Sequence, residues 1–209
     1  MELQLAYFKL GLLPTNTYVL VNQEDGHGVL VDPAIYADEV YDAMVEMGVK
    51  TLDYILLTHG HFDHILGVPG FLEKFPEAKV VIHEDDEAFL TDPELSHAAK
   101  HGLEQPPMKA DIVVKDGDDV PWEGENFHVL HTPGHTPGCI VFLFQNLMFA
   151  GDTLFRLSCG RTDFPESLPE KMIPSLKKLA ALDGNYTVLP GHDNFTELEF
   201  ERQNNPYMK

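Results

Sequence analysis

The chain has 209 residues, of which 44% are hydrophobic, and a formal net charge of −20. This length suits one large domain with a buried core and is short for two independent domains. A strongly negative chain repels nucleic acid and anionic membrane surfaces, so we expect neither as a partner. No stretch approaches the ~20 apolar residues of a membrane helix, and the N-terminus lacks the basic start and cleavage site of a secretory signal. We therefore expect a cytoplasmic protein that acts on a small molecule, with its oligomeric state left open.

Hydrophobic periodicity in the first half of the chain alternates between the two-residue period of strands and the helical period. Residues 25–28, Asp-Gly-His-Gly, have the composition of a tight turn, so the flanking strands are expected to pair as a hairpin. Val40, Met44 and Met47 stand at helical spacing, and Gly48 is a fitting helix end. The expected strands are 3–8, 18–22, 29–32, 51–58 and 79–83, and the expected helices are 36–47, 65–75 and 84–90.

The second half opens with residues 92–110, which carry Pro93, Pro106 and Pro107 and show no clear period. We interpret them as a loop near the mouth of a site. Strands are then expected at 112–115, 127–131, 140–144, 147–150 and 187–189, and helices at 169–182 and 196–204. Strand blocks mixed with flanking helices predict a layered α/β protein. We expect a single domain over residues 1–209.

Histidines gather in one short segment of the chain. Three of the eleven fall in the run Thr58-His59-Gly60-His61-Phe62-Asp63-His64. His135 and His192 stand in Gly/Pro-rich contexts, and Asp152 directly follows an apolar strand. Each segment is a strand end followed by a turn, which is where a rigid sheet can hold side chains in a fixed constellation.

The spacing of these residues indicates a metal site. On an extended segment His59 and His61 share one face and can reach one ion, while a turn redirects Asp63 and His64 towards a neighbouring ion. Imidazole and carboxylate ligands suit Zn, Fe or Mn, and the lack of Cys ligands argues against a purely structural zinc site. The two cysteines, Cys139 and Cys159, are expected to be small packing residues.

At these residues the sequence resembles the metallo-β-lactamase superfamily, and within it the small single-domain form of the glyoxalase II-like (hydroxyacylglutathione hydrolase-like) branch. The resemblance also covers Asn16-Thr17-Tyr18 and the strand end Leu30-Val31-Asp32-Pro33, with all motifs in the family order. It implies a four-layer αββα sandwich with metals at the edge between the two sheets. Only 17 residues follow His192, so we expect the C-terminal helical substrate domain of long glyoxalase II enzymes to be absent here.

Carried over by position, the resemblance implies two divalent metal ions, with zinc favoured and iron or manganese as alternatives. The first would be held by His59, His61 and His135, the second by Asp63, His64 and His192, and Asp152 would bridge them. A hydroxide between the metals would then attack a thioester of the S-lactoylglutathione kind, and Asp63 would also orient that hydroxide. A thiol of pKa ~8.5 leaves as thiolate with little need of a general acid.

Two sets of residues outside the ligands bear on the site. Arg161 falls where the family carries a glutathione-binding Lys, so it is a candidate substrate contact, but Asp163 replaces a Tyr and offers Arg161 an ion pair instead. Asp32 and Asn16 are candidates to orient a ligand histidine. The remaining histidines are expected to be structural (His83, His131), in a turn (His27) or on the surface (His97, His101, His128).

Other functions remain open at this point. The stretch Cys159-Gly160-Arg161-Thr162-Asp163-Phe164 also resembles persulfide dioxygenases, which use one iron held by two histidines and a carboxylate. A lactonase would use the same hydroxide. A metal-binding or electron-transfer module is a non-enzyme alternative. It is disfavoured because the diiron flavoprotein partners of the superfamily usually carry Glu where His61 stands, and because we find no flavin-binding domain.

Overall fold

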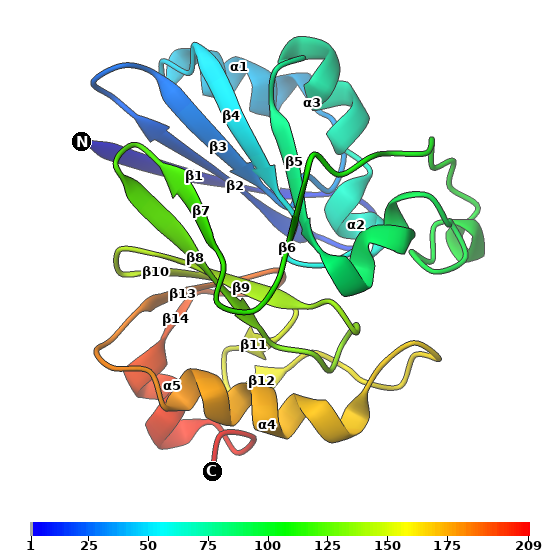
Figure 1. The fold of residues 1–209 in the computed structure, drawn as a ribbon, viewed down its shortest axis with the longest axis vertical. Helices are drawn as coiled ribbons and strands as arrows, with labels where there is room; N and C mark the ends of the chain where they lie inside the picture. Colours follow the sequence, from blue (N-terminus) through cyan, green and yellow to red (C-terminus); the bar gives the residue numbers. More distant parts are fainter. Residues whose placement is uncertain (1) are drawn as a thin grey trace.

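The structure is a computed structural model that describes residues 2–209. Two six-stranded sheets face each other, with α1 and α3 covering the outer face of one and α4 and α5 covering the outer face of the other (Figure 1). This order of layers confirms the expected four-layer αββα arrangement. Among the described residues, no helix is long and apolar enough to cross a membrane.

The first sheet has the strand order β1-β2-β3-β4-β5-β6. β2 pairs antiparallel with both β1 and β3, and β3 to β6 run parallel. The strands are β1 (Leu3–Leu10), β2 (Thr15–Asn22), β3 (His27–Val31), β4 (Thr51–Leu56), β5 (Lys79–His83) and β6 (Ile112–Val114).

The second sheet has the order β14-β13-β10-β9-β8-β7 and is antiparallel except for the parallel pair β10 and β13. β11 and β12 follow β10 in the chain and pair with each other in a separate two-stranded sheet. The strands are β7 (Asp119–Trp122), β8 (Glu125–His131), β9 (Ile140–Phe144), β10 (Leu147–Gly151), β11 (Leu154–Phe155), β12 (Ser158–Cys159), β13 (Thr187–Pro190) and β14 (Thr196–Glu197).

The helices occupy the connections between strands. The α-helices are α1 (Asp38–Glu46), α2 (Phe62–Ile65), α3 (Val68–Lys74), α4 (Pro169–Ala180) and α5 (Leu198–Asn204), and the 3₁₀ helices are η1 (Glu84–Leu90) and η2 (Ala99–His101). Asp38 and Glu39 stand in the first turn of α1, where they complement the helix dipole, and Gly48 at φ +86° follows its end. Pro169 occupies the first turn of α4, where its missing N–H costs nothing.

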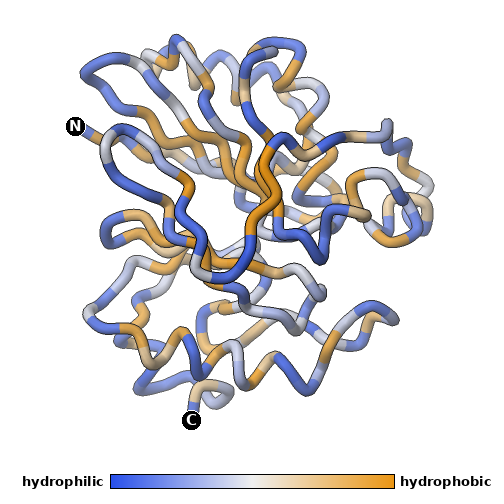
Figure 2. Tube along the Cα trace, in the orientation of Figure 1, coloured by the Kyte–Doolittle hydropathy of each residue, from blue (hydrophilic) through white to orange (hydrophobic). Residues whose placement is uncertain are grey.

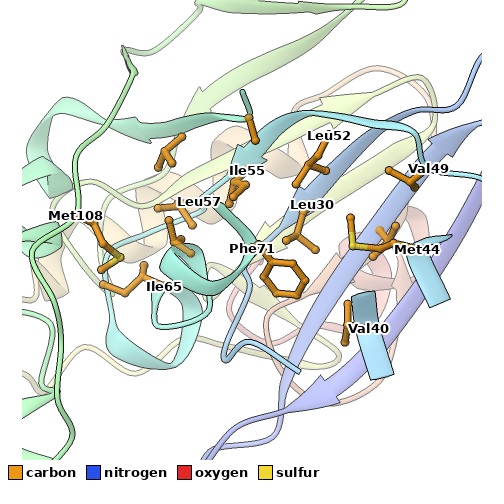
Figure 3. Close-up of a cluster of buried hydrophobic side chains, with 14 of the residues drawn as sticks. Leu30, Val40, Met44, Val49, Leu52, Ile55, Leu57, Ile65, Phe71 and Met108 are labelled. Atoms are coloured by element: carbon orange, nitrogen blue, oxygen red, sulfur yellow. The ribbon is translucent and has the colours of Figure 1, made fainter. Parts of the chain in front are cut away.

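Three apolar clusters fill the spaces between the layers. Because successive residues of a strand point to opposite faces, Val19 and Val21 of β2 pack towards α1 and α3, while Tyr18 and Leu20 pack between the sheets. Figure 3 shows the outer cluster, in which the ring of Phe71 of α3 lies beside Leu30 of β3, with Met44 of α1 on the other side of Leu30. In Figure 2 the strands are hydrophobic along their buried lengths, whereas the turns that join them are hydrophilic.

Strand direction decides where the site lies. β3 and β4 are parallel, and so are β10 and β13, so the carboxyl ends within each pair lie side by side. Tyr18 Oη donates to Pro190 O over 2.6 Å, which joins the first sheet to the end of β13 in the second. The loops that follow these strand ends therefore meet at one edge of the sandwich.

Most expected elements are present, with differences at turns and edges. Of the helix expected at 65–75, α3 covers Val68–Lys74, and a separate short helix, α2, ends at Ile65 before it. The two are not continuous because Gly67 N donates to Pro33 O over 2.8 Å instead of to a carbonyl of α2. The edge strand β7 and the short strands β11, β12 and β14 were not predicted, because they are too short to show a period. Residues 92–110 form a loop as expected, with one turn of 3₁₀ helix, η2, inside it.

Replacing Phe149 tests the core between the sheets. Its ring is fully buried and contacts Tyr18 of the opposite sheet, with ring centroids 5.6 Å apart. We expect Phe149→Ala to lower the free energy of unfolding by about 3–5 kcal/mol, because it removes a buried ring and leaves a cavity. Chemical denaturation measures the change, and Phe200→Ala, at a ring that is 37% exposed, is the control with a much smaller effect. Equal effects of the two substitutions would contradict this assignment of the core.

Candidate metal centre

The candidate ligands are brought to one edge of the sandwich by four loops. His59, His61, Asp63 and His64 follow β4, His135 lies between β8 and β9, Asp152 follows β10, and His192 follows β13. These seven side chains come from distant parts of the chain, yet they form one cluster, in which all but the partly exposed His192 are buried. The structure thus brings together every residue that the sequence singled out as a possible ligand.

The first group contains His59, His61 and His135, whose donor nitrogens lie within 4.8 Å of one another. His61 Nδ1 is 2.9 Å from His135 Nε2. The ring of His59 stands 4.9 Å from that of His61 and 5.0 Å from that of His135, centroid to centroid. Three nitrogens at this separation can surround one ion.

The second group contains Asp63, His64 and His192, again within 4.8 Å of one another. Asp63 Oδ2 is 3.2 Å from His192 Nε2 and 3.7 Å from His64 Nε2. Asp152 lies between the two groups. Its Oδ2 is 3.4 Å from His135 Nε2 and 3.6 Å from His192 Nε2, and its Oδ1 is 3.5 Å from His64 Nε2.

Several buried atoms of this cluster show that it fits a metal. Within the described part of the chain, His59 Nε2, His64 Nε2 and Asp152 Oδ1 have no hydrogen-bond partner, although each is buried. Buried polar atoms are rarely left unpaired, because desolvation costs roughly 1–3 kcal/mol for each. Gly191 permits this packing, since a Cβ there would lie 2.3 Å from Asp152 Oδ1. Metal coordination would satisfy these unpartnered atoms.

The protonation states of the cluster also suit a cation. Burial, reinforced by the neighbouring imidazoles, holds the pKa of His59 well below its usual value, so the ring is neutral with a lone pair available. Burial opposes a charge on His64 as well, but the carboxylates of Asp63, Asp32 and Asp152 outweigh it and raise the pKa of His64 to about 10. The second group therefore attracts positive charge, which either a proton or a metal ion can supply.

Each candidate ligand histidine has its other ring nitrogen engaged by the protein, which fixes the ring orientation. The partners are Thr58 Oγ1 for His59 (3.2 Å), Glu166 Oε1 for His61 (3.0 Å), Asp32 Oδ2 for His64 (2.9 Å), Arg161 O for His135 (2.8 Å) and Pro14 O for His192 (3.2 Å).

Asp32 follows β3, where it contacts both Thr58 and the candidate ligand His64. It adopts φ +50°, which is uncommon for a residue other than glycine. Its carboxylate accepts hydrogen bonds from Thr58 N (2.8 Å) and Thr58 Oγ1 (2.7 Å) besides facing His64. Asn16 acts on another loop, because its Nδ2 donates to Pro190 O at 3.0 Å and to Asp193 O at 3.2 Å, on either side of His192.

Three residues near the site were missed by the sequence analysis. Asp86 is buried and accepts hydrogen bonds from Gly60 N, Thr136 Oγ1 and Gly138 N over 2.7–2.9 Å, so one carboxylate ties two ligand loops together. Glu166 contacts His61. The placement of His97 on the surface was wrong, because its side chain is only 12% exposed and points at Glu166. In the sequence, Asp86 is one of several acidic residues at the start of the expected helix 84–90. Glu166 and His97 are single polar residues in expected loops.

The other histidines lie outside the cluster. His128 is exposed and pairs with Asp119. His83 and His131 stack with ring centroids 4.0 Å apart, His83 Nδ1 accepts from Asp85 N, and His131 Nε2 faces Pro137 O at 2.8 Å. These contacts favour the structural role expected for His83 and His131.

A pocket of about 570 Å³ opens onto the cluster. Its apolar lining includes Leu13, Phe155 and Phe164, and its cationic lining includes Lys100 and Arg161. The Arg161 guanidinium pairs with the Asp163 carboxylate through Nε–Oδ1 and Nη2–Oδ2 contacts of 2.6 Å each, with both side chains more than 60% exposed. This is the ion pair that the sequence offered as the alternative to a substrate contact.

Comparison with known proteins fits this geometry. The sequence model of the metallo-beta-lactamase superfamily matches residues 10–192. The chain belongs to this superfamily.

Three relatives illustrate the range of its members. The chain is 31% identical over 196 residues to the hydroxyacylglutathione hydrolase GloC of Haemophilus influenzae, a match that covers 90% of this chain and 91% of that protein. The crystal structure of the BLEG-1 B3 metallo-beta-lactamase superimposes with a TM-score of 0.89 at 30% identity, covering 99% of this chain and 100% of the other. TTHA1623 in a di-iron-bound form superimposes with a TM-score of 0.83 at 34% identity, covering 97% and 99%.

Removing a ligand side chain tests the site directly. We expect His59→Ala and Asp152→Ala to lose at least half of the metal that the wild-type protein retains after dialysis, because each removes a donor that faces the cluster. Elemental analysis of the purified proteins measures the change. His128→Ala, at an exposed histidine outside the cluster, is the matched control and should keep wild-type metal content. A fully metallated Asp152→Ala variant would contradict a bridging position for Asp152.

Proposed function

We propose that the protein is a metal-dependent hydrolase that cleaves thioesters of the S-lactoylglutathione kind with two divalent metal ions. The observation that carries this proposal is the division of the donor atoms into two groups that share Asp152. His59, His61 and His135 would hold one ion, and Asp63, His64 and His192 the other. A paired site of this kind is suited to hydrolysis of an activated carbonyl.

The chemistry of a thioester matches the residues of the site. When bound, two divalent ions supply Lewis acidity that polarises a carbonyl and lowers the pKa of a water molecule towards ~7. The thiol released from a thioester has a pKa of ~8.5 and leaves as a thiolate, so the protein needs no strong general acid at that position. Zinc is the favoured metal, and the di-iron form of TTHA1623 keeps iron as an alternative.

Asp63 is proposed to orient the attacking water as well as to bind metal. Burial opposes ionisation of Asp63, but His64 and His192 outweigh it and lower the pKa of the carboxyl, so it is ionised at neutral pH. Thr15 Oγ1 donates to Asp63 Oδ2 over 3.2 Å and helps to fix the orientation of the carboxylate. An ionised, fixed carboxylate accepts a hydrogen bond from water and directs its lone pair towards the substrate.

The pocket supports a substrate that is partly apolar and partly anionic. Phe155 and Phe164 offer apolar surface for an acyl group or a thiol stem, and Lys100 and Arg161 offer positive charge to a carboxylate. Cys159 also lines the pocket, but burial raises the pKa of its thiol, which disfavours a route through a cysteine nucleophile.

Metal content and a substrate panel distinguish this proposal from the alternatives. Protein from metal-replete medium is expected to hold about two ions per chain and to turn over S-lactoylglutathione faster than a neutral thioester, a lactone or a β-lactam. The β-lactam is included because of the BLEG-1 neighbour. One iron per chain with oxygen consumption on glutathione persulfide would instead identify a persulfide dioxygenase, and preferred lactone hydrolysis a lactonase. Metal binding without any of these activities would favour a metal-binding or electron-transfer module.

The Arg161–Asp163 pair generates a separate prediction about substrate charge. If Arg161 contacts the substrate, Arg161→Ala should raise KM for an anionic thioester roughly two- to fivefold, as expected for an exposed ionic contact. Asp163→Asn should lower that KM, because it releases the guanidinium and removes a repelling charge. Steady-state kinetics with a neutral thioester are the control and should not change. Unchanged KM values together with a lower melting temperature would instead show that the pair only stabilises the loop.

A further inference from the structure

Glu166 stands between a candidate metal ligand and the loop that borders the pocket. It lies just before α4, and its side chain is only 11% exposed. Its Oε1 atom is 3.0 Å from His61 Nε2 and 2.6 Å from His97 Nε2. One carboxylate oxygen therefore accepts from two imidazoles that belong to different segments of the chain.

We propose that Glu166 is a positioning residue that fixes the ring and the tautomer of His61 for metal binding and, through His97, ties residues 92–102 to the same point. This inference rests on the proposed metal centre but concerns metal affinity and loop order rather than the substrate.

The ring of His61 needs such a partner because of its orientation. His61 presents Nδ1 to His135, whereas His64, His135 and His192 meet the cluster through Nε2. A neutral imidazole carries one proton, so a lone pair on Nδ1 requires the proton on Nε2. The Glu166 carboxylate accepts that proton's hydrogen bond and so selects the tautomer that can bind a metal.

Packing leaves little freedom for the His61 ring once this bond is made. The ring of Phe164 lies against the His61 ring with a centroid separation of 5.2 Å, and the ring of Phe89 in η1 lies 6.0 Å away. The side chain of His61 is only 5% exposed, so water has little access to replace the carboxylate. Loss of Glu166 would leave Nε2 of a buried ring without its acceptor.

His97 extends the same contact to the loop. It adopts φ +67°, a left-handed conformation that is uncommon for residues other than glycine and that neighbouring contacts can stabilise. Glu166 supplies such a contact from the side chain, and Phe62 N donates to Ser96 O over 2.8 Å from the backbone. The ring of His97 also packs on Phe164, with centroids 4.7 Å apart. The loop is thus held against the first turn of α2, directly beside the ligands His61 and Asp63.

Metal affinity and histidine NMR test the proposal without any measurement of turnover. The metal-free protein is titrated with Zn²⁺ against a chelating indicator, for the wild type, Glu166→Ala, Glu166→Gln and the control Glu170→Ala. Glu170 is an exposed carboxylate four residues further on, in the first turn of α4. We expect Glu166→Ala to weaken Zn²⁺ binding roughly 10- to 100-fold, Glu166→Gln to weaken it less because the amide oxygen still accepts, and Glu170→Ala to have no effect.

Two further readouts separate positioning from general stability. In the zinc-loaded wild type, ¹⁵N–¹H spectra of the imidazoles should show His61 protonated at Nε2, and this signal should be lost or broadened in Glu166→Ala. Hydrogen exchange of residues 92–102 should become faster in both Glu166→Ala and His97→Ala, whereas only Glu166→Ala should weaken Zn²⁺ binding.

Distinct results overturn this inference and the proposed function. Wild-type Zn²⁺ affinity in Glu166→Ala, with an unchanged His61 spectrum, would reject the positioning role while leaving the metal centre intact. A wild-type protein that binds no Zn²⁺ would reject the metal centre and the positioning role with it. Intact metal binding without thioester hydrolysis would reject the proposed substrate alone.

Discussion

The site depends on gathering seven candidate ligand side chains, five of them histidines, at one edge of the sandwich, where six of the seven are buried and only His192 is partly exposed. Such a cluster is stable only if each side chain has one atom fixed by the protein and another satisfied within the site. The outer atoms of the five imidazoles meet a hydroxyl, two carboxylates and two backbone carbonyls. The inner atoms of His59, His64 and Asp152 remain without hydrogen-bond partners among the described residues. A metal ion is the partner that fits both their arrangement and the carboxylates around them.

The rest of the fold keeps these side chains in place. Aromatic and aliphatic side chains fill the space between the two sheets and pack the sheets against each other. Buried carboxylates then connect the loops: Asp32 joins the end of β3 to Thr58 and His64, and Asp86 joins the loop of Gly60 to that of Gly138. Charged groups are costly to bury alone, but here each accepts several hydrogen bonds. The same contacts that offset burial of these carboxylates also set the positions of the ligand loops.

Substrate selection involves a different and more exposed part of the molecule. The protein as a whole is strongly acidic, yet Lys100 and Arg161 line the pocket. Their positive charge favours an anionic group beside the cluster, while Asp163 competes for Arg161. The candidate metal centre is therefore largely buried, whereas the charged contacts that would select among the proposed thioester substrates lie in solvent, where single interactions are weak.

The sequence by itself determined the layered α/β class and the group of candidate ligands, because strand periodicity and closely spaced histidines are local signals. It did not show the short strands β7, β11, β12 and β14, whose lengths are below a detectable period, nor the break between α2 and α3. Only the tertiary structure decided which carboxylate serves which histidine. Asp86, Glu166 and His97 are separated from their partners by 26 to 105 residues, and nothing in their local sequence distinguishes them from surface residues. Their positions follow from the packing of the two sheets and the path of residues 92–110, which local sequence patterns do not encode.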